Sequence, residues 1–410
     1  MKKGIQVLSV VGAFILLVIG IFTAVFGEGT AVIPAIMLIL SVGLLLLSAF
    51  IAKRPQAFGK MWRIVCIVLA GIFALISVLS MSFSFNTKGT PIADIDKKVE
   101  IWGKNIPGNS TKSKLDDMNI NKNARTLGAT LNFIGAIVGE EYKDVEKELD
   151  TFSYIHGIKV GYEKETYEDT PFLIPYIVEH SDSAVIVVPG GGYGYKSIEG
   201  GNGEGKDVAL ALNQKGISAF VLWYRSNPYQ FPIPQLDLQR AVRYIRYNAE
   251  TYGIDPQKIS LIGYSAGGYQ IGSFINQYRG VDAFPDGYIK DDIDKTDDNV
   301  NAAAMIYPAL TFRYNVPMLF CAFNDDDVRS ETKRKELLNE TDLALNFNSK
   351  DIKQLVCYGT KDGMVGMNGA KAYIRAAKIV NTDITELSAK DQDHGFAQKY
   401  YMESFLKLIV

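Results

Sequence analysis

The chain has 410 residues, of which 48% are hydrophobic and 21% charged, and its formal net charge is −2. Because neutralising phosphate groups requires a basic face, this charge balance argues against a nucleic-acid-binding protein. The chain has three cysteines and three histidines, without a Cys-x-x-Cys or His-x-x-x-His pair. This usage excludes a disulfide scaffold and argues against a zinc site, so we expect no metal ion and no cofactor.

Charged residues are distributed unevenly along the chain. Residues 1–85 carry only seven of them, whereas residues 86–410 contain 37 basic and 44 acidic residues and a net charge of −7. The second part has the composition of a soluble protein and is long enough to bury a substantial core. We therefore predict a membrane region at 1–85, a linker or cap at 86–158 and a globular domain at 159–410.

Three windows of the membrane region, residues 5–26, 31–52 and 64–85, each contain 22 residues and no charge. At about 1.5 Å per residue, a helix of this length crosses the hydrocarbon core of a bilayer. The first window is too long for the apolar part of a signal peptide, and two more follow it. The sequence therefore predicts three transmembrane helices. Because they contain no ionisable residue, we expect them to anchor the chain rather than to carry ions.

Basic residues indicate the orientation of this region. They precede the first window or lie between the second and the third, at Lys2, Lys3, Lys53, Arg54, Lys60 and Arg63. The loop between the first two windows contains only one charge, Glu28. The positive-inside rule then places the amino terminus in the cytoplasm and the globular domain outside the cell membrane.

The globular part alternates short apolar runs with longer segments of helical period. Strands are predicted at 172–178, 184–188, 219–224, 259–263, 303–307, 354–358 and 384–387, and helices at 205–215, 236–252, 267–278 and 369–380. Several of the runs are apolar at successive positions, which is typical of strands that are buried on both faces. The fold class is therefore α/β with a mostly parallel sheet.

A candidate nucleophile follows one of these strands. The strand at 259–263 leads into Gly263-Tyr-Ser265-Ala-Gly267 and then into a helical segment. This Gly-x-Ser-x-Gly pattern, between a strand and a helix, is the context of a nucleophile elbow. Ser265 would stand exposed above the sheet, and the amide of Ala266 would lie at the amino terminus of a helix.

A glycine run at the end of an earlier strand offers backbone amides. Pro189-Gly-Gly191-Gly192-Tyr-Gly194 follows the strand at 184–188. Such a loop can direct its N–H groups at a developing oxyanion. A dinucleotide-binding loop is the rival interpretation, but the spacing does not fit Gly-x-Gly-x-x-Gly. We predict an oxyanion hole formed by the amides of Gly191, Gly192 and Ala266.

The histidine positions indicate the base that would activate the serine. His156 precedes the predicted sheet, and His180 lies in a polar turn between two early strands. His394 follows the last strand, where the chain order Ser…Asp/Glu…His requires the base. His394 is therefore the predicted general base.

The acid that orients this histidine should follow the preceding strand. Asp362 follows the apolar run at 354–358 and is our choice, with the cluster 325–327 as the rival. A second acidic cluster, 291–298, lacks the glycine and glutamate of a calcium loop and is predicted to be solvated surface.

These motifs together resemble a known family. Residues from about 170 to 410 are similar to the α/β-hydrolase fold, specifically to esterases of the acetyl-xylan-esterase-like and hormone-sensitive-lipase-like groups. The matching stretches are 189–194, 220–225, 252–256 with 263–268, 359–362 and 394–396. Lipase-type relatives begin the glycine run with histidine, whereas this chain has Pro189, as the acetylesterase-like relatives do. Residues 1–158 lie outside the resemblance.

The sequence thus predicts a membrane-anchored serine ester hydrolase with the triad Ser265, His394 and Asp362. The resemblance implies short acyl groups as substrates, such as acetyl groups on carbohydrate. A serine peptidase or an acyltransferase would use the same three residues, and a non-catalytic membrane interaction protein is the alternative from another class.

Overall fold

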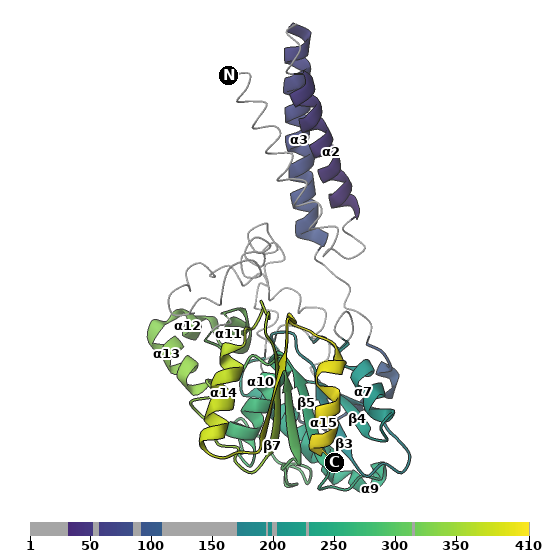
Figure 1. Cartoon of the computed structure of the whole chain (residues 1–410), viewed down its shortest axis with the longest axis vertical. Helices are drawn as coiled ribbons and strands as arrows, with labels where there is room; N and C mark the ends of the chain where they lie inside the picture. Colours follow the sequence, from purple (N-terminus) through teal and green to yellow (C-terminus); the bar gives the residue numbers. More distant parts are fainter. Residues whose placement is uncertain are drawn as a thin grey trace. The chain divides into compact units, whose positions relative to one another are not determined.

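The computed structural model describes residues 32–51, 57–84, 92–108, 170–193, 196–198, 203–226, 229–313 and 316–409 (Figure 1). The predicted first transmembrane helix and most of the predicted linker or cap lie outside these residues. The chain divides into two compact units, which are described separately.

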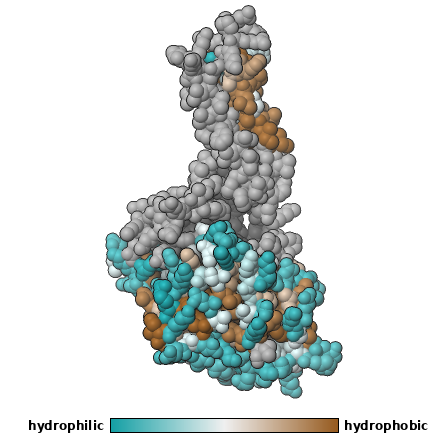
Figure 2. Space-filling model, viewed as in Figure 1, coloured by the Kyte–Doolittle hydropathy of each residue, from teal (hydrophilic) through white to brown (hydrophobic). Residues whose placement is uncertain are grey.

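The described part of the first unit consists of helices α2 (Val32–Ile51) and α3 (Ala57–Ser84), at the second and third apolar windows. The two helices lie side by side, and the Ser41 hydroxyl donates a hydrogen bond to the Ala70 carbonyl oxygen at 3.0 Å. Both helices expose large hydrophobic side chains, and the coloured part of this unit is mostly brown in Figure 2. Within the described residues, no helix meets the combined length and hydropathy that crossing a membrane requires. The transmembrane helices therefore stay a prediction.

The described residues of the second unit form an eight-stranded sheet in the order β1-β2-β4-β3-β5-β6-β7-β8. Its strands are β1 (Val99–Glu100), β2 (Phe172–Tyr176), β3 (Ala184–Val188), β4 (Ser218–Trp223), β5 (Ile259–Tyr264), β6 (Ala302–Ile306), β7 (Lys353–Gly359) and β8 (Ile384–Ala389). All neighbours from β4 to β8 pair in parallel, whereas β1 and β2 are antiparallel. The prediction of a mostly parallel sheet is confirmed, and the seven predicted strands all occur.

Helices cover both faces of this sheet. The described helices of the second unit are η1 (Ile95–Lys97), α7 (Lys206–Asn213), α8 (Ile233–Tyr247), α9 (Ala249–Tyr252), α10 (Ala266–Ser273), η5 (Phe274–Tyr278), α11 (Val316–Ala322), α12 (Asp325–Arg329), α13 (Glu331–Glu340), α14 (Asn368–Ile379), η6 (Gln398–Tyr400) and α15 (Met402–Ile409). Helices α7 and α15 pack on one face, whereas α8, α10 and α14 pack on the other (Figure 1).

Strand β3 shows why its sequence is apolar at every position. Ala184, Ile186 and Val188 point toward the core on the α8, α10 and α14 side. Val185 and Val187 belong to the core on the α7 and α15 side. A strand with helices on both faces has no side that contacts water, so alternation of polar and apolar residues disappears. The outer surface of the second unit, by contrast, is mostly hydrophilic in the view of Figure 2.

The described residues 92–108, from the predicted linker or cap, pack on the edge of the sheet. Strand β1 pairs with β2, and the Trp102 indole N–H donates to Asp237 at 2.9 Å. The guanidinium of Arg240 covers the Trp102 ring at 4.7 Å and donates to the Ile101 carbonyl oxygen at 2.7 Å. This segment is therefore bound to helix α8 by both packing and buried hydrogen bonds.

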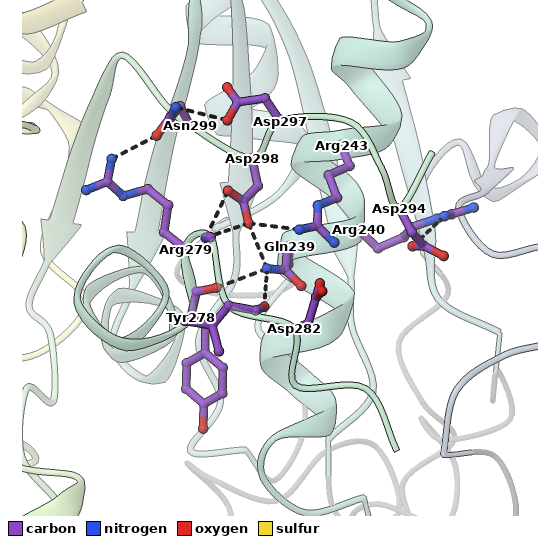
Figure 3. A network of polar contacts seen from close by, with 12 residues as sticks. Gln239, Arg240, Arg243, Tyr278, Arg279, Asp282, Asp294, Asp297, Asp298 and Asn299 are labelled. Carbon is purple, nitrogen blue, oxygen red and sulfur yellow. Dashed lines mark hydrogen bonds and ion pairs between the residues drawn. The ribbon is translucent and has the colours of Figure 1, made fainter. Parts of the chain in front are cut away.

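The acidic cluster at 291–298 is not solvated throughout, so that prediction was wrong for Asp294 and Asp298. Both carboxylates are buried and are bound to helix α8 (Figure 3). Arg240 donates to Asp294 at 2.7 Å, and Gln239 donates to Asp298 at 2.7 Å. Arg243 lies 3.3 Å from Asp298. Because α8 directs these polar side chains into the protein, they require buried acidic partners.

Candidate functional site

Ser265 lies at the sharp turn between strand β5 and helix α10. Its backbone angles, φ 52° and ψ −116°, are strained for a residue with a side chain. Its N–H donates to the Ile306 carbonyl oxygen at 3.0 Å, and its own carbonyl oxygen accepts the N–H groups of Tyr269 and Ala309. These hydrogen bonds to β6 and α10 hold the strained turn in place, as a nucleophile elbow requires.

The glycine before the turn allows the strand and the helix to approach each other. A β-carbon at Gly263 would lie 2.5 Å from the Gly267 carbonyl oxygen. Real β-carbons essentially never come so close to a backbone atom, so any larger residue at 263 would force β5 and α10 apart. The Gly-x-Ser-x-Gly spacing is thus a packing requirement of the turn.

The imidazole of His394 connects the serine to a carboxylate. His394 Nε2 lies 3.0 Å from Ser265 Oγ, and His394 Nδ1 lies 2.8 Å from Asp362 Oδ2. The side chain of His394 is 9% exposed and that of Asp362 is 2% exposed. Because a carboxylate accepts hydrogen bonds only, we assign the imidazole proton to Nδ1, which leaves Nε2 to accept the serine proton.

Asp362 follows strand β7 and is held in its ionised form. Its Oδ1 accepts the N–H groups of Met364 at 3.0 Å and Val365 at 2.9 Å. Burial alone would raise the pKa of the Asp362 carboxyl. The hydrogen bond from His394, together with the two amides, outweighs that effect and leaves the pKa of Asp362 below its ordinary value.

Asp393 is a residue whose role the sequence did not indicate. Its Oδ1 accepts the N–H of Gly363 at 2.9 Å and the N–H of His394 at 2.7 Å. One carboxylate oxygen therefore joins the loop after β7 to the loop after β8. This contact fixes the backbone on which Asp362 and His394 stand.

The glycine loop after β3 lies directly against the serine. A β-carbon at Gly190 would be 2.8 Å from the Ser265 Cβ. Gly191 and Gly192 have φ values of 120° and 63°. Within the described part of the chain, the amides of Gly191, Gly192 and Ala266 have no protein acceptor. These N–H groups are thus available to a negatively charged oxygen.

Aromatic side chains support this loop from below. Tyr193 is fully buried, and its ring packs against Phe231 at 5.1 Å and Tyr224 at 6.2 Å. Tyr224 donates a hydrogen bond to the Pro189 carbonyl oxygen at 2.9 Å. The loop is therefore bound to the core at Pro189 and at Tyr193.

The other sequence candidates lie elsewhere or are not described. His180 is exposed in the turn after β2, 3.5 Å from the Glu179 carboxylate, and His156 lies outside the described residues. The rival acids Asp326 and Asp327 are exposed on helix α12, and nothing is described of the Asp325 side chain. No group of three or more metal-ligating side chains occurs among the described residues.

Comparisons with known proteins found a family and a solved structure that are similar to this chain. The sequence model of the family described as BD-FAE matches residues 172–312. A crystal structure of an acetyl ester-xyloside bifunctional hydrolase from Caldicellulosiruptor lactoaceticus is 26% identical, with a TM-score of 0.50. The match covers 59% of this chain and 87% of that one.

Two curated proteins match shorter stretches. Endo-1,4-beta-xylanase B of Butyrivibrio fibrisolvens is 33% identical over 142 residues, which cover 30% of this chain and 21% of that protein. An acetylxylan esterase of Xylanibacter ruminicola is 36% identical over 89 residues, which cover 22% of this chain and 18% of that protein. The chain thus spans about a fifth of the length of these relatives. The fold and these likenesses together show a domain with the α/β-hydrolase fold, similar to esterases.

Proposed function

We propose that this chain is a membrane-anchored serine esterase that removes short acyl groups, acetyl in particular, from carbohydrate. The observation that carries the proposal is the continuous contact from Ser265 through His394 to Asp362. A nucleophile, a base and an orienting acid in hydrogen-bond reach are the components of acyl transfer through a covalent intermediate.

In the first half of the reaction, Ser265 Oγ attacks the ester carbonyl carbon while His394 Nε2 takes the hydroxyl proton. The carbonyl oxygen becomes an oxyanion, which the N–H groups of Gly191, Gly192 and Ala266 stabilise. The ionised Asp362 stabilises the imidazolium that forms. His394 then gives its proton to the departing alcohol oxygen, the ester bond breaks, and the acyl group remains on Ser265.

In the second half, water replaces the alcohol. His394 Nε2 takes a proton from the water as its oxygen attacks the acyl carbon, and a second oxyanion forms in the same place. Collapse of this intermediate breaks the bond to Ser265, which recovers its proton from His394. The products are a carboxylic acid and the free enzyme.

The names of the relatives support a carbohydrate ester as substrate. One is an acetylxylan esterase, one is a xylanase, and the crystallised relative is an acetyl ester-xyloside bifunctional hydrolase. All three are named for action on xylan or xyloside, and two of the names include an acetyl ester. We therefore assign acetylated sugars of the xylan type as the first substrates to test.

The first unit supports the anchoring part of the proposal. Its two described helices expose many large hydrophobic side chains, which are Ile36, Ile39, Leu40, Leu46, Leu47, Phe50, Met61, Trp62, Ile64, Val65, Ile67, Val68, Leu69, Ile72 and Leu75. An apolar surface of this extent is unfavourable in water and favourable in lipid. With the positive-inside rule, anchoring would place the hydrolase domain outside the cytoplasm. Extraction of the chain from membranes by alkaline carbonate would contradict integral anchoring.

The proposed activity is tested with nitrophenyl esters of increasing acyl length and with acetylated xylo-oligosaccharides. We expect Ser265→Ala to lower kcat at least about 10³-fold, because the covalent route is lost. Unchanged turnover by this variant would contradict the proposal. Cleavage of an aminoacyl amide would instead indicate a peptidase, and transfer of acetyl to an added alcohol would indicate an acyltransferase. Absence of labelling by a fluorophosphonate would indicate a non-catalytic protein.

A further inference from the structure

Glu204 is a buried carboxylate next to the site that the mechanism above does not use. It precedes helix α7, and only 1% of its surface is exposed. Burying an acidic group costs free energy unless hydrogen-bond donors surround it. The partners of Glu204 therefore show what the carboxylate does in this position.

The first partner is the glycine loop. Glu204 Oε2 accepts the N–H of Gly190 at 2.7 Å. Gly190 immediately precedes the two glycines whose amides we assign to the oxyanion hole. The Glu204 N–H also donates to the Ser197 carbonyl oxygen, and the Ser197 N–H donates to the Gly190 carbonyl oxygen. The side chain of Glu204 thus binds Gly190 directly, and its backbone is connected to Gly190 through Ser197.

The second partner leads to the imidazole. Glu204 Oε1 accepts the hydroxyl of Tyr307 at 2.9 Å. The Tyr307 ring packs against the His394 ring, with 4.9 Å between their centroids and an angle of 61°. Tyr307 directly follows strand β6, with its N–H bound to the Cys357 carbonyl oxygen of β7 at 2.7 Å. One carboxylate therefore contacts both the loop of the oxyanion hole and the aromatic ring beside the base.

We propose that Glu204 is a positioning residue, which keeps the oxyanion amides and the His394 imidazole in register with Ser265. The inference rests on the esterase function proposed above. Transition-state stabilisation depends on donors that are fixed before the reaction, and a shift of about 1 Å can cost about 100-fold in rate. Because the amide geometry matters most when the oxyanion forms, the loss of Glu204 should affect kcat more than KM.

The test compares Glu204→Ala and Glu204→Gln with the wild type, all purified in detergent. Active sites are counted by end-point fluorophosphonate labelling, and turnover is expressed per labelled site. We expect Glu204→Ala to lower kcat at least about tenfold, with KM changed less than about threefold. Glu204→Gln should have an intermediate kcat, because its amide oxygen can still accept the Gly190 N–H whereas its NH₂ group cannot accept the Tyr307 hydroxyl.

Asp298 provides a matched control. It is also a buried carboxylate (Figure 3), and it also accepts a glycine N–H, that of Gly280 at 3.0 Å. It precedes the amino end of β6, whereas Ser265 follows the carboxyl end of β5. Asp298→Ala should lower the thermal midpoint while kcat per labelled site stays within about twofold of the wild type. An equal loss of kcat in both alanine variants would show that any buried carboxylate has this effect, and would overturn the inference.

Two further outcomes are decisive. If Glu204→Ala folds and keeps the wild-type kcat per labelled site, the inference is overturned, but the proposed esterase function is not. If the wild type shows no ester turnover, or if its turnover does not depend on Ser265, the proposed function is overturned, and the inference falls with it. If Glu204→Ala does not fold, Glu204→Gln and Tyr307→Phe carry the test, each with an expected kcat loss of at least about threefold. Unchanged kcat in both of these variants also overturns it.

Discussion

Gly267 lies against the last residue of strand β3, and a β-carbon on it would be 2.2 Å from the Val188 carbonyl oxygen. The same β-carbon would lie 2.6 Å from the Pro189 carbonyl oxygen. Helix α10, which begins next to Ser265, therefore touches the backbone from which the glycine loop departs. The nucleophile and the oxyanion loop share one contact surface, with no space between them for a side chain.

Replacement of Gly267 by alanine should consequently disturb both parts of the site. The new methyl group meets backbone atoms, which cannot rotate away, so β3 or α10 has to move. We expect Gly267→Ala to lower kcat at least about tenfold through the displaced loop. The matched control is Gly103→Ala, because a β-carbon at Gly103 meets nothing within 4 Å. Equal activity of the two variants would contradict the interpretation.

Asp362→Asn tests the assignment of the acid. An asparagine in this place can turn its NH₂ group toward His394 Nδ1, which then loses its proton to Nε2 and can no longer accept the serine proton. In serine hydrolases of this mechanism the equivalent change costs about 10⁴-fold in kcat. Asp326→Asn, in the rival acidic cluster, should leave kcat unaltered because that side chain is exposed on helix α12. A greater loss from Asp326→Asn would reverse the assignment.

The parts of the site that could be predicted from sequence are those fixed by strand ends. In a parallel sheet the carboxyl ends of neighbouring strands meet at one edge, so residues that follow β5, β7 and β8 come together there. Ser265, Asp362 and His394 occupy these places and are in hydrogen-bond contact. Their catalytic roles stay a proposal until the variants are measured.

The parts that could not be predicted depend on contacts between loops. Glu204 and Asp393 act on backbone amides of distant segments, and no periodicity marks such residues. The burial of Asp294 was missed for a related reason. Acidic clusters are usually solvated, and only the packing of helix α8 shows that Arg240 points inward and requires a buried partner.

Trp102 should stabilise the hydrolase domain although it lies before the predicted boundary at residue 159. It is 4% exposed, and its ring packs against Phe284 and Tyr288 in addition to Arg240. Loss of so large a buried side chain typically costs about 3–5 kcal/mol. We expect Trp102→Ala to lower the thermal midpoint by roughly 2–4 °C per kcal/mol, and Trp102→Phe to lower it less. An unaltered midpoint in Trp102→Ala would mean that this segment is a detached linker.

The ion pair between Asp291 and Arg240 should make part of the stability depend on pH. The hydrogen bond from the Arg240 guanidinium, at 2.6 Å, is the main cause that lowers the pKa of Asp291 to about 2. Because this value is below that of the unfolded chain, about 3.9, the contribution is present above pH 4 and is lost as the pH falls through 2. Half of the Asp291 side chain is exposed, so we expect about 1 kcal/mol or less. The difference in thermal midpoint between the wild type and Asp291→Asn should therefore be equal at pH 7 and pH 5 and smaller at pH 3.5. The control is Asp292→Asn, which removes an exposed ion pair with Lys295. If the difference in thermal midpoint between the wild type and Asp291→Asn grows as the pH falls, the pair of Asp291 with Arg240 does not stabilise the fold.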